Sequence, residues 1–304
     1  MLYKSRIMPR ELQIYQYLNL RVKLSGKERK HLFNLQKGYE GELQFDSLTA
    51  TIRSDCLILN DLLLSNNRNI FQIDTLIILP DTVYLFEVKN FEGDYFYDSD
   101  RLYTQVPPNS EVNNPLIQLH RSESLLRQLL HNLGCKLTIQ ALIVFINPEF
   151  TLYQTPINKP FLLPGQINRF LQKVQSTSQK ITNEHKTLAN QLISLHIQDP
   201  PLYIPPSYQY HDLKKGNICR NCGSYEITVK GTKCICKSCG EKELSEDLIM
   251  RNVKELMLLF PEMIITTNTI FEWCDKVLPK RTIGRTLKRH MNCKGEHQWR
   301  HYEF

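Results

Sequence analysis

The sequence predicts an α/β protein in which a mixed β-sheet is flanked by helices and followed by two smaller domains. Three observations predict this architecture. Two apolar runs joined at Pro80-Asp81 form a β-hairpin pattern between residues 71 and 90. Amphipathic helical stretches precede and follow this hairpin, as expected for a sheet covered by helices. The last third of the chain contains two CxxC pairs and then three short helical patterns.

Length and charge narrow the class of protein. The chain has 304 residues, of which 41% are hydrophobic, so it can form a large core with small additional domains. The net charge of +7 is compatible with a nucleic-acid partner. No apolar run reaches the ~20 residues that cross a membrane, and the amino-terminal stretch has no signal-peptide core. We therefore expect a cytoplasmic protein that does not enter membranes.

Composition divides the chain into four segments. Residues 1–200 contain the helix and strand patterns of the sheet domain. Residues 201–213 belong to a proline-rich linker, because the stretch 198–212 holds four prolines. Residues 214–244 contain the CxxC pairs, and residues 245–304 contain the three helical patterns.

The elements of the first domain can be placed in order. We expect helices at residues 9–21, 26–46, 165–175 and 183–197. A further helix should begin at Pro115, with Asn114 as its cap. We expect strands at residues 56–64 and 137–146 besides the two strands of the hairpin. Residues 94–104 should form one more strand or hairpin.

Three charged residues interrupt the apolar hairpin. If the turn is centred on Pro80-Asp81, Asp74 lies opposite Glu87, with Cβ atoms ~4.5–5.5 Å apart. Lys89 shares the face of Glu87, because side chains alternate along a strand. The hairpin therefore predicts two carboxylates and one amine on one patch. A β-bulge would change this register.

Such a patch indicates metal-dependent phosphodiester hydrolysis. Two neighbouring carboxylates repel unless a cation lies between them. Mg²⁺ prefers one or two carboxylates together with waters and substrate phosphates, and a bound cation lowers the pKa of water. Lys89 would then position the attacking water. The alternative is a buried structural ion pair between Lys89 and either Asp74 or Glu87.

Four motifs in order along the chain resemble the nuclease-related domain (NERD) family, whose core is of the PD-(D/E)xK type. They span roughly residues 36–146 and are Gly38-Tyr-Glu-Gly41-Glu42, Gln72-Ile73-Asp74, Glu87-Val88-Lys89-Asn90 and Asn114-Pro115-x-x-Gln118. The resemblance implies catalytic roles for Glu42, Asp74, Glu87, Lys89 and Gln118. In the family pattern Glu42, Asp74, Glu87 and Lys89 form the metal site and Gln118 is an accessory polar group. We predict that Asp74 and Glu87 bind Mg²⁺ or Mn²⁺ together with the Val88 carbonyl, and that Glu42 supports a metal or a water.

Two of these residues have structural alternatives. Leu35, Tyr39 and Glu42 share one helical face, so the Glu42 carboxylate needs a partner, which a salt bridge would also supply. Gln118 lies in the first turn of its helix and could be a structural amide.

The cysteine pairs predict a zinc ribbon. Cys219 and Cys222 form one CxxCG knuckle, and Cys236 and Cys239 form the other. Four thiolates suit tetrahedral Zn²⁺, and the residues between the knuckles fit a β-hairpin. The open alternatives are Cys234 as a ligand, a redox pair, and an Fe–S centre.

The last helical pattern carries a basic face. Residues 279–287 resemble the recognition helix of helix-turn-helix and winged-helix domains, and eight Lys or Arg against two Glu follow residue 275. A helix of this kind fits the major groove of DNA. The expected DNA contacts are Arg281, Thr282, Arg285, Lys288 and Arg289. The alternative is a solvated helix in a protein-binding bundle.

Together these patterns predict a Mg²⁺-dependent deoxyribonuclease whose carboxy-terminal domains engage DNA. Two other functions stay open: a non-catalytic DNA-binding regulator that retains the nuclease fold, and an RNA-cleaving enzyme. The oligomeric state does not follow from the sequence.

Overall fold

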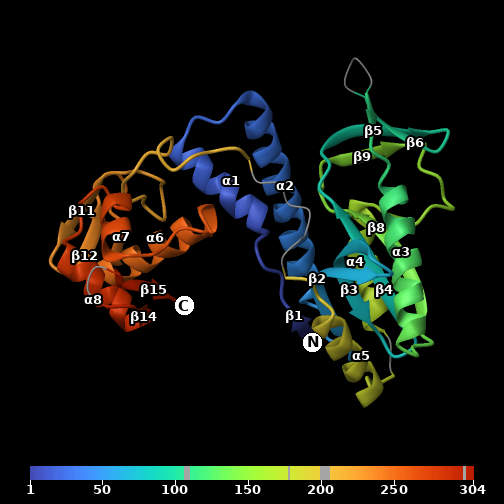
Figure 1. Ribbon diagram of the computed structural model, residues 1–304. Coiled ribbons are helices and arrows are strands. Elements are labelled where there is room, and N and C mark those ends of the chain that lie inside the picture. The colour runs from blue at the N-terminus through green and yellow to red at the C-terminus, as the bar shows by residue number, and fades with distance from the viewer. Residues whose placement is uncertain (106–109, 177–178, 199–205, 297–298) are drawn as a thin grey trace. The chain divides into compact units, whose positions relative to one another are not determined.

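The computed structural model describes residues 1–105, 110–176, 179–198, 206–296 and 299–304 (Figure 1). The chain forms two compact units, one from residues 1–8 and 33–203 and the other from residues 9–32 and 204–304. The part of the predicted proline-rich linker at residues 199–205 lies outside the described residues. Within the described ranges, no helix combines the length and apolar character needed to span a bilayer.

A six-stranded mixed sheet forms the centre of the first unit. The strands are β1 (Leu2–Lys4), β2 (Leu57–Asn66), β3 (Asn69–Ile78), β4 (Thr82–Lys89), β8 (Thr138–Phe145) and β10 (Phe161–Leu162), in the spatial order β1-β2-β3-β4-β8-β10. Neighbours are antiparallel at β2–β3 and β3–β4. They are parallel at β1–β2, β4–β8 and β8–β10. The sheet is therefore mixed, as predicted.

Helices cover both faces of this sheet. They are α2 (Gly26–Thr49), α3 (Pro115–Asn132), α4 (Pro164–Gln175) and α5 (Asn183–Ser194). Phe45 of α2 and Leu171 of α4 pack in one buried cluster with Phe86 of β4. Helices α3 and α5 contribute to a second cluster, which contains Leu85, the residue before Phe86 on β4. Because side chains alternate along a strand, these two clusters lie on opposite faces of the sheet.

The hairpin has the register that the sequence predicts. Thr75 pairs with Phe86, and Ile78 pairs with Val83. Asp74 and Glu87 are the next residues along the two strands, so the same register sets them opposite each other. Their position at the end of this ladder brings both carboxylates to one end of the hairpin.

A second, four-stranded sheet was predicted only in part. Its strands are β5 (Gly93–Asp98), β6 (Arg101–Thr104), β7 (Glu111–Val112) and β9 (Phe150–Tyr153), in the order β7-β6-β5-β9. The β5–β6 hairpin turns at Ser99 and Asp100, which have positive φ angles of 46° and 60°. Such a two-residue turn suits the twist of a hairpin. Strand β9 joins in parallel with β5 from far along the chain, a pairing that no local pattern reveals.

The second unit includes α1 (Arg10–Arg21), although the predicted boundary assigned residues 9–32 to the first domain. Arg21 forms an ion pair with Glu255, with Nε 2.6 Å from Oε1, and both side chains are fully buried. The Arg21 guanidinium also stacks on Trp273, 4.0 Å from the ring centroid. A buried charge needs such a partner, and the partner lies more than 200 residues away in sequence.

The rest of the second unit contains the expected hairpin and three helices. A three-stranded sheet consists of β11 (Ile227–Lys230), β12 (Lys233–Cys236) and β13 (Lys242–Leu244). The helices are α6 (Ser245–Leu259), α7 (Thr267–Trp273) and α8 (Lys280–His290), followed by the hairpin β14 (Asn292–Lys294) and β15 (His301–Glu303). Leu256, Trp273 and Leu287, one from each helix, are fully buried, so the three helices have a core.

Candidate active site

The end of the β3–β4 hairpin brings together three of the predicted catalytic residues. The Asp74 carboxylate on β3 accepts a hydrogen bond from the Val88 amide of β4, with an Oδ2–N distance of 2.7 Å. On β4, the Lys89 ammonium lies 2.6 Å from Glu87 Oε1. Asp74 and Glu87 are buried, with 6% and 1% of their surfaces exposed. The two buried carboxylates and the half-buried amine therefore form one polar cluster.

Burial makes the charged forms of both carboxylates unfavourable. Burial, together with the Asp74 charge and against the effect of Lys89, raises the pKa of Glu87 to about 8. Burial also raises the pKa of Asp74, against the effects of Lys89 and of the Val88 amide. A cation bound between these carboxylates would favour their ionised forms.

One oxygen of this cluster has no partner among the described residues. Glu87 Oε2 is buried and accepts no hydrogen bond there. An unsatisfied buried oxygen is costly unless water or an ion contacts it. Two carboxylates with a neighbouring backbone carbonyl, such as that of Val88, are hard oxygen donors of the kind that Mg²⁺ and Mn²⁺ accept. The donor set therefore fits a divalent cation.

Gln118 contacts the cluster from α3. Its Oε1 accepts a hydrogen bond from Lys89 Nζ at 3.2 Å. The start of α3 is well defined, because Asn114 Oδ1 caps the Leu116 amide at 3.0 Å and Pro115 occupies the first turn. This cap places Gln118 in the first turn of the helix, where it reaches Lys89.

Glu42 lies near Asp74 but is bound by an arginine. The Arg6 Nη1 atom is 2.7 Å from Glu42 Oε2. Burial, together with the Asp74 charge and against the effect of Arg6, raises the pKa of Glu42 to about 8. Glu42 therefore forms the salt bridge that the sequence left as an alternative, and it also lies within the electrostatic field of Asp74.

Gly41 allows α2 to approach the strand that carries the site. A Cβ atom at Gly41 would lie 2.6 Å from the Asn90 Cβ and 3.1 Å from Ile146 Cγ2. Asn90 directly follows β4, and its Nδ2 donates to the Lys37 carbonyl of α2 at 2.7 Å. The absence of a side chain at Gly41 thus lets the helix bring Glu42 close to Asp74.

Sequence reasoning missed three charged residues near the site: Arg6, Asp46 and Asp61. Arg6 binds both Glu42 and Asp46. Asp61 lies opposite Asp74 across the β2–β3 register and has a positive φ of 55°. Asp61 could have been noticed, because it interrupts an apolar strand as Asp74 does. Arg6 gives no comparable signal in the sequence.

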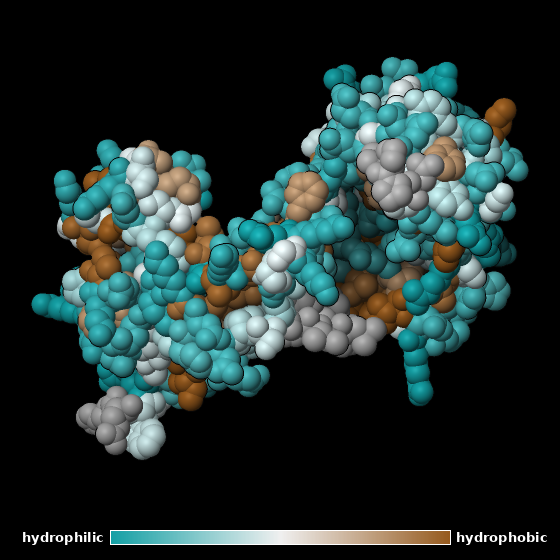
Figure 2. Space-filling model, turned by 90° about the horizontal axis from the view of Figure 1, so that it is seen from above, coloured by the Kyte–Doolittle hydropathy of each residue, from teal (hydrophilic) through white to brown (hydrophobic). Residues whose placement is uncertain are grey.

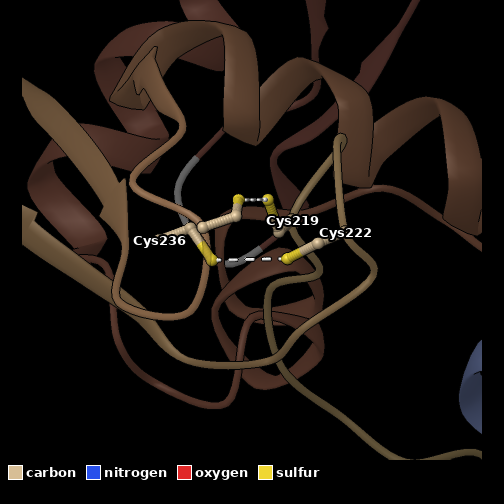
Figure 3. A group of neighbouring side chains, drawn as sticks. Cys219, Cys222 and Cys236 are labelled. Atoms are coloured by element: carbon tan, nitrogen blue, oxygen red, sulfur yellow. Dashed lines mark hydrogen bonds between the residues drawn. The ribbon is translucent and has the colours of Figure 1, made fainter.

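The four predicted cysteines form a separate cluster in the second unit (Figure 3). Their sulfur atoms all lie within 4.8 Å of one another. The Cys219–Cys239 and Cys222–Cys236 sulfur distances are both 3.6 Å. This is far from a ~2.05 Å disulfide and close to the ~3.8 Å edge of a tetrahedron with Zn–S bonds of ~2.3 Å. The cluster is compatible with a zinc ribbon.

Local geometry explains why these cysteines converge. In each knuckle a backbone amide, that of Gly223 or Gly240, donates to the first cysteine's carbonyl at 3.0 Å. Both glycines have positive φ angles, 71° and 77°, which glycine adopts without strain. Cys234 lies in β12 with its sulfur 3.4 Å from Ser245 Oγ and is not a member of the cluster.

Helix α8 presents most of its predicted basic residues to solvent. Arg281, Arg285 and Lys288 are exposed, whereas Ile283 and Leu287 are fully buried. The two other predicted contact residues are less available to a partner. Thr282 is half-buried, and Arg289 forms an ion pair with Glu246, with Nη1 2.7 Å from Oε2. The charge of Arg289 is thus partly neutralised within the unit.

Comparison with known proteins addresses the first unit. No curated protein and no solved structure matches the chain. Residues 37–146 match the family model of the nuclease-related domain. This range contains all five residues predicted to be catalytic, whereas Arg6 and the cysteine cluster lie outside it. Residues 37–146 are therefore similar to a nuclease-related domain of the NERD family, and this range forms much of the first unit.

Proposed function

We propose that the protein is a divalent-metal-dependent nuclease that cleaves DNA. The observation that carries this proposal is the buried Glu87 Oε2, which has no partner in the described parts of the chain and lies next to Asp74 in a nuclease-related domain. Asp74 and Glu87 would hold Mg²⁺ or Mn²⁺, together with the Val88 carbonyl. The bound cation would lower the pKa of a water molecule and stabilise the charge that develops on the phosphoryl group.

The side chains around this position have separate roles. Lys89 Nζ has three N–H donors, of which Glu87 and Gln118 each take one. The remaining donor can hold the attacking water or a phosphate oxygen. Gln118 is a second acceptor for the Lys89 ammonium besides Glu87, and two such hydrogen bonds limit the rotation of a long flexible side chain. Asp74 is oriented by the Val88 amide.

The second unit would bind the DNA. Arg281, Arg285 and Lys288 are solvent-exposed on α8, and a recognition helix places such residues against bases and phosphates. On the face of the molecule seen in Figure 2, hydrophilic residues cover most of the surface and hydrophobic residues form scattered patches. The zinc ribbon would be structural, since its four thiolates complete a tetrahedron.

Cleavage of plasmid DNA tests the proposal. The purified chain is incubated with circular and linear plasmid in Mg²⁺ or Mn²⁺, beside Glu87→Ala and Lys89→Ala. Glu92→Ala is the matched control, because Glu92 is an exposed glutamate in the loop after β4 that pairs with Lys37. We expect cleavage by the parent and by Glu92→Ala and nearly none by the two site variants. Parental activity in Glu87→Ala would show that the site is misassigned.

The same assay distinguishes the other two functions. RNA and DNA oligonucleotides of equal sequence are offered together. Cleavage of RNA alone would identify a ribonuclease, and tight DNA binding without cleavage under any divalent cation would identify a regulator with a nuclease fold.

A further inference from the structure

Arg6 precedes the nuclease-related domain in sequence but lies within its acidic cluster in space. Its side chain is 1% exposed. Strand β1 pairs in parallel with β2, with Lys4 opposite Leu59, and the chain then continues to Arg6. This edge pairing carries the arginine to the part of the sheet where Asp74 lies.

The Arg6 guanidinium connects two elements of the site. Nη1 donates to Glu42 Oε2 at 2.7 Å, and Nη2 donates to the Asp74 backbone oxygen at 2.7 Å. Nε and Nη2 also bind the two carboxylate oxygens of Asp46, at 2.9 and 3.0 Å. Helix α2 and strand β3 are therefore joined by one positive group. A guanidinium stays protonated at any pH at which proteins fold, so this charge is permanent.

Arg6 binds the acidic groups that a second metal ion would otherwise bind. In two-metal sites the cations lie ~3.5–4 Å apart and are held by neighbouring carboxylates. Here the Glu42 carboxylate lies close enough to Asp74 for the Asp74 charge to raise its pKa, and Arg6 already binds it. A second divalent cation would have to displace Arg6 from a buried position and would be repelled by its charge.

We infer that Arg6 occupies the position of a second divalent cation, so that the catalytic cluster binds a single Mg²⁺ or Mn²⁺ at Asp74 and Glu87. This inference rests on the proposed function. It assigns Glu42 to the orientation of Arg6 and not to the metal. Arg6 is thus a positioning residue that determines the metal stoichiometry of the site.

Counting bound Mn²⁺ tests the inference without reference to activity. The zinc-loaded full chain is titrated with Mn²⁺, and free Mn²⁺ is measured by electron paramagnetic resonance for the parent, Arg6→Gln and Arg6→Lys. We expect one Mn²⁺ per chain for the parent and for Arg6→Lys, which keeps the positive charge. Arg6→Gln should bind two, because Glu42 and Asp46 are then free to hold a cation. Glu87→Gln in the parent should remove the single Mn²⁺.

The outcomes separate the inference from the proposed function. Two Mn²⁺ in the parent, or one in a folded Arg6→Gln variant, would overturn the inference alone. No Mn²⁺ in the parent would overturn the metal-dependent function and the inference with it. Circular dichroism melting checks that Arg6→Gln folds. If Arg6→Gln does not fold, the double variant Arg6→Gln/Asp46→Asn removes the positive charge of Arg6 together with one of its acidic partners. This variant should still bind two Mn²⁺ per chain, and a single bound Mn²⁺ would count against the inference.

Discussion

Asp74 Oδ2 lies 2.7 Å from the backbone nitrogen of Val88, the residue between Glu87 and Lys89. This hydrogen bond joins the acidic residue of one hairpin strand to the centre of the acidic-basic motif on the other. It fixes the Asp74 carboxylate beside Glu87 without requiring a bound ion. The hydrogen bond therefore orients the Asp74 carboxylate, and such preorganisation would serve the proposed reaction.

The first prediction concerns Lys89. Replacing it by alanine removes the donor between Glu87 and Gln118, so kcat for DNA cleavage should fall by about 10²–10³-fold, as for other groups that stabilise developing charge. Lys37→Ala is the control, because Lys37 is also paired with a glutamate, Glu92, but lies outside the cluster. Steady-state kinetics on a labelled duplex measure both. Equal losses in the two variants would argue against a role for Lys89.

The second prediction concerns pH. The pKa of Glu87 is raised to about 8 in the folded protein, above the 4.5 of the unfolded chain, so the folded state binds more protons between these values. The free energy of unfolding of the metal-free site should therefore fall as pH rises from 5 to 8. Mg²⁺ should raise the melting temperature more at pH 8 than at pH 5, because it binds the ionised form.

Thermal unfolding of the zinc-loaded chain with and without Mg²⁺ measures this effect. Glu87→Gln has no group to titrate at this position, so its melting temperature should vary less with pH. An identical pH dependence in parent and variant would contradict the prediction.

The third prediction concerns zinc. Elemental analysis should find one Zn²⁺ per chain, and the Cys222→Ser/Cys239→Ser pair should lose it, because two thiolates cannot hold the ion tightly. Cys234→Ser is the control: this thiol lies on β12 beside Ser245, outside the cluster. Zinc loss should also unfold the ribbon, since so short a segment cannot bury a core of its own. Loss of zinc in Cys234→Ser alone would require a different ligand set.

The fourth prediction concerns DNA binding. Arg281→Ala and Arg285→Ala should each cost ~1–3 kcal/mol of DNA affinity if they make bidentate base contacts. Adding Lys288→Ala should also reduce the dependence of binding on salt, by about 0.9 in the slope of log K against log salt per lost phosphate contact. Fluorescence anisotropy with a labelled duplex measures both. The full chain is needed, because the second unit includes residues 9–32.

A charge-matched triple on another helix controls for the loss of net charge. Lys27, Arg29 and Lys30 are exposed near the start of α2 and can all be replaced by alanine. If this triple weakens binding as much as the α8 triple does, α8 is not the recognition helix, and a protein-binding role for it moves ahead.

The fifth prediction compares two glycines of α2. Gly41→Ala places a Cβ 2.6 Å from the Asn90 Cβ, so the helix must shift and the free energy of unfolding should fall by ~1–3 kcal/mol. Cleavage should fall too, since Glu42 moves with the helix. Gly38→Ala meets no atom within 4 Å and should stabilise by ~0.5–1 kcal/mol, because alanine favours a helix. Denaturant unfolding measures the free energy of unfolding of both variants. Similar changes in the two would contradict the close approach at Gly41.

The sequence by itself determined the features that local chemistry specifies. The register of the hairpin followed from a Pro80-Asp81 turn, because a tight turn leaves one alignment of the strands that bury its apolar residues. The cysteine cluster followed in the same way, since each CxxCG turn presents two sulfurs over a few residues. The start of α3 followed from Asn114 and Pro115.

Only the tertiary structure decided which distant charges meet. Arg6 binds Glu42 across 36 residues, Arg21 binds Glu255 across 234, and Arg289 binds Glu246 across 43. Any of several acidic residues could have partnered each arginine. Unlike a helix or a strand, a long-range ion pair has no periodic sequence pattern that would identify its members. For the buried Arg6 and Arg21, burial selects the partner, because a charge removed from water is tolerated only where the folded chain supplies its counter-charge.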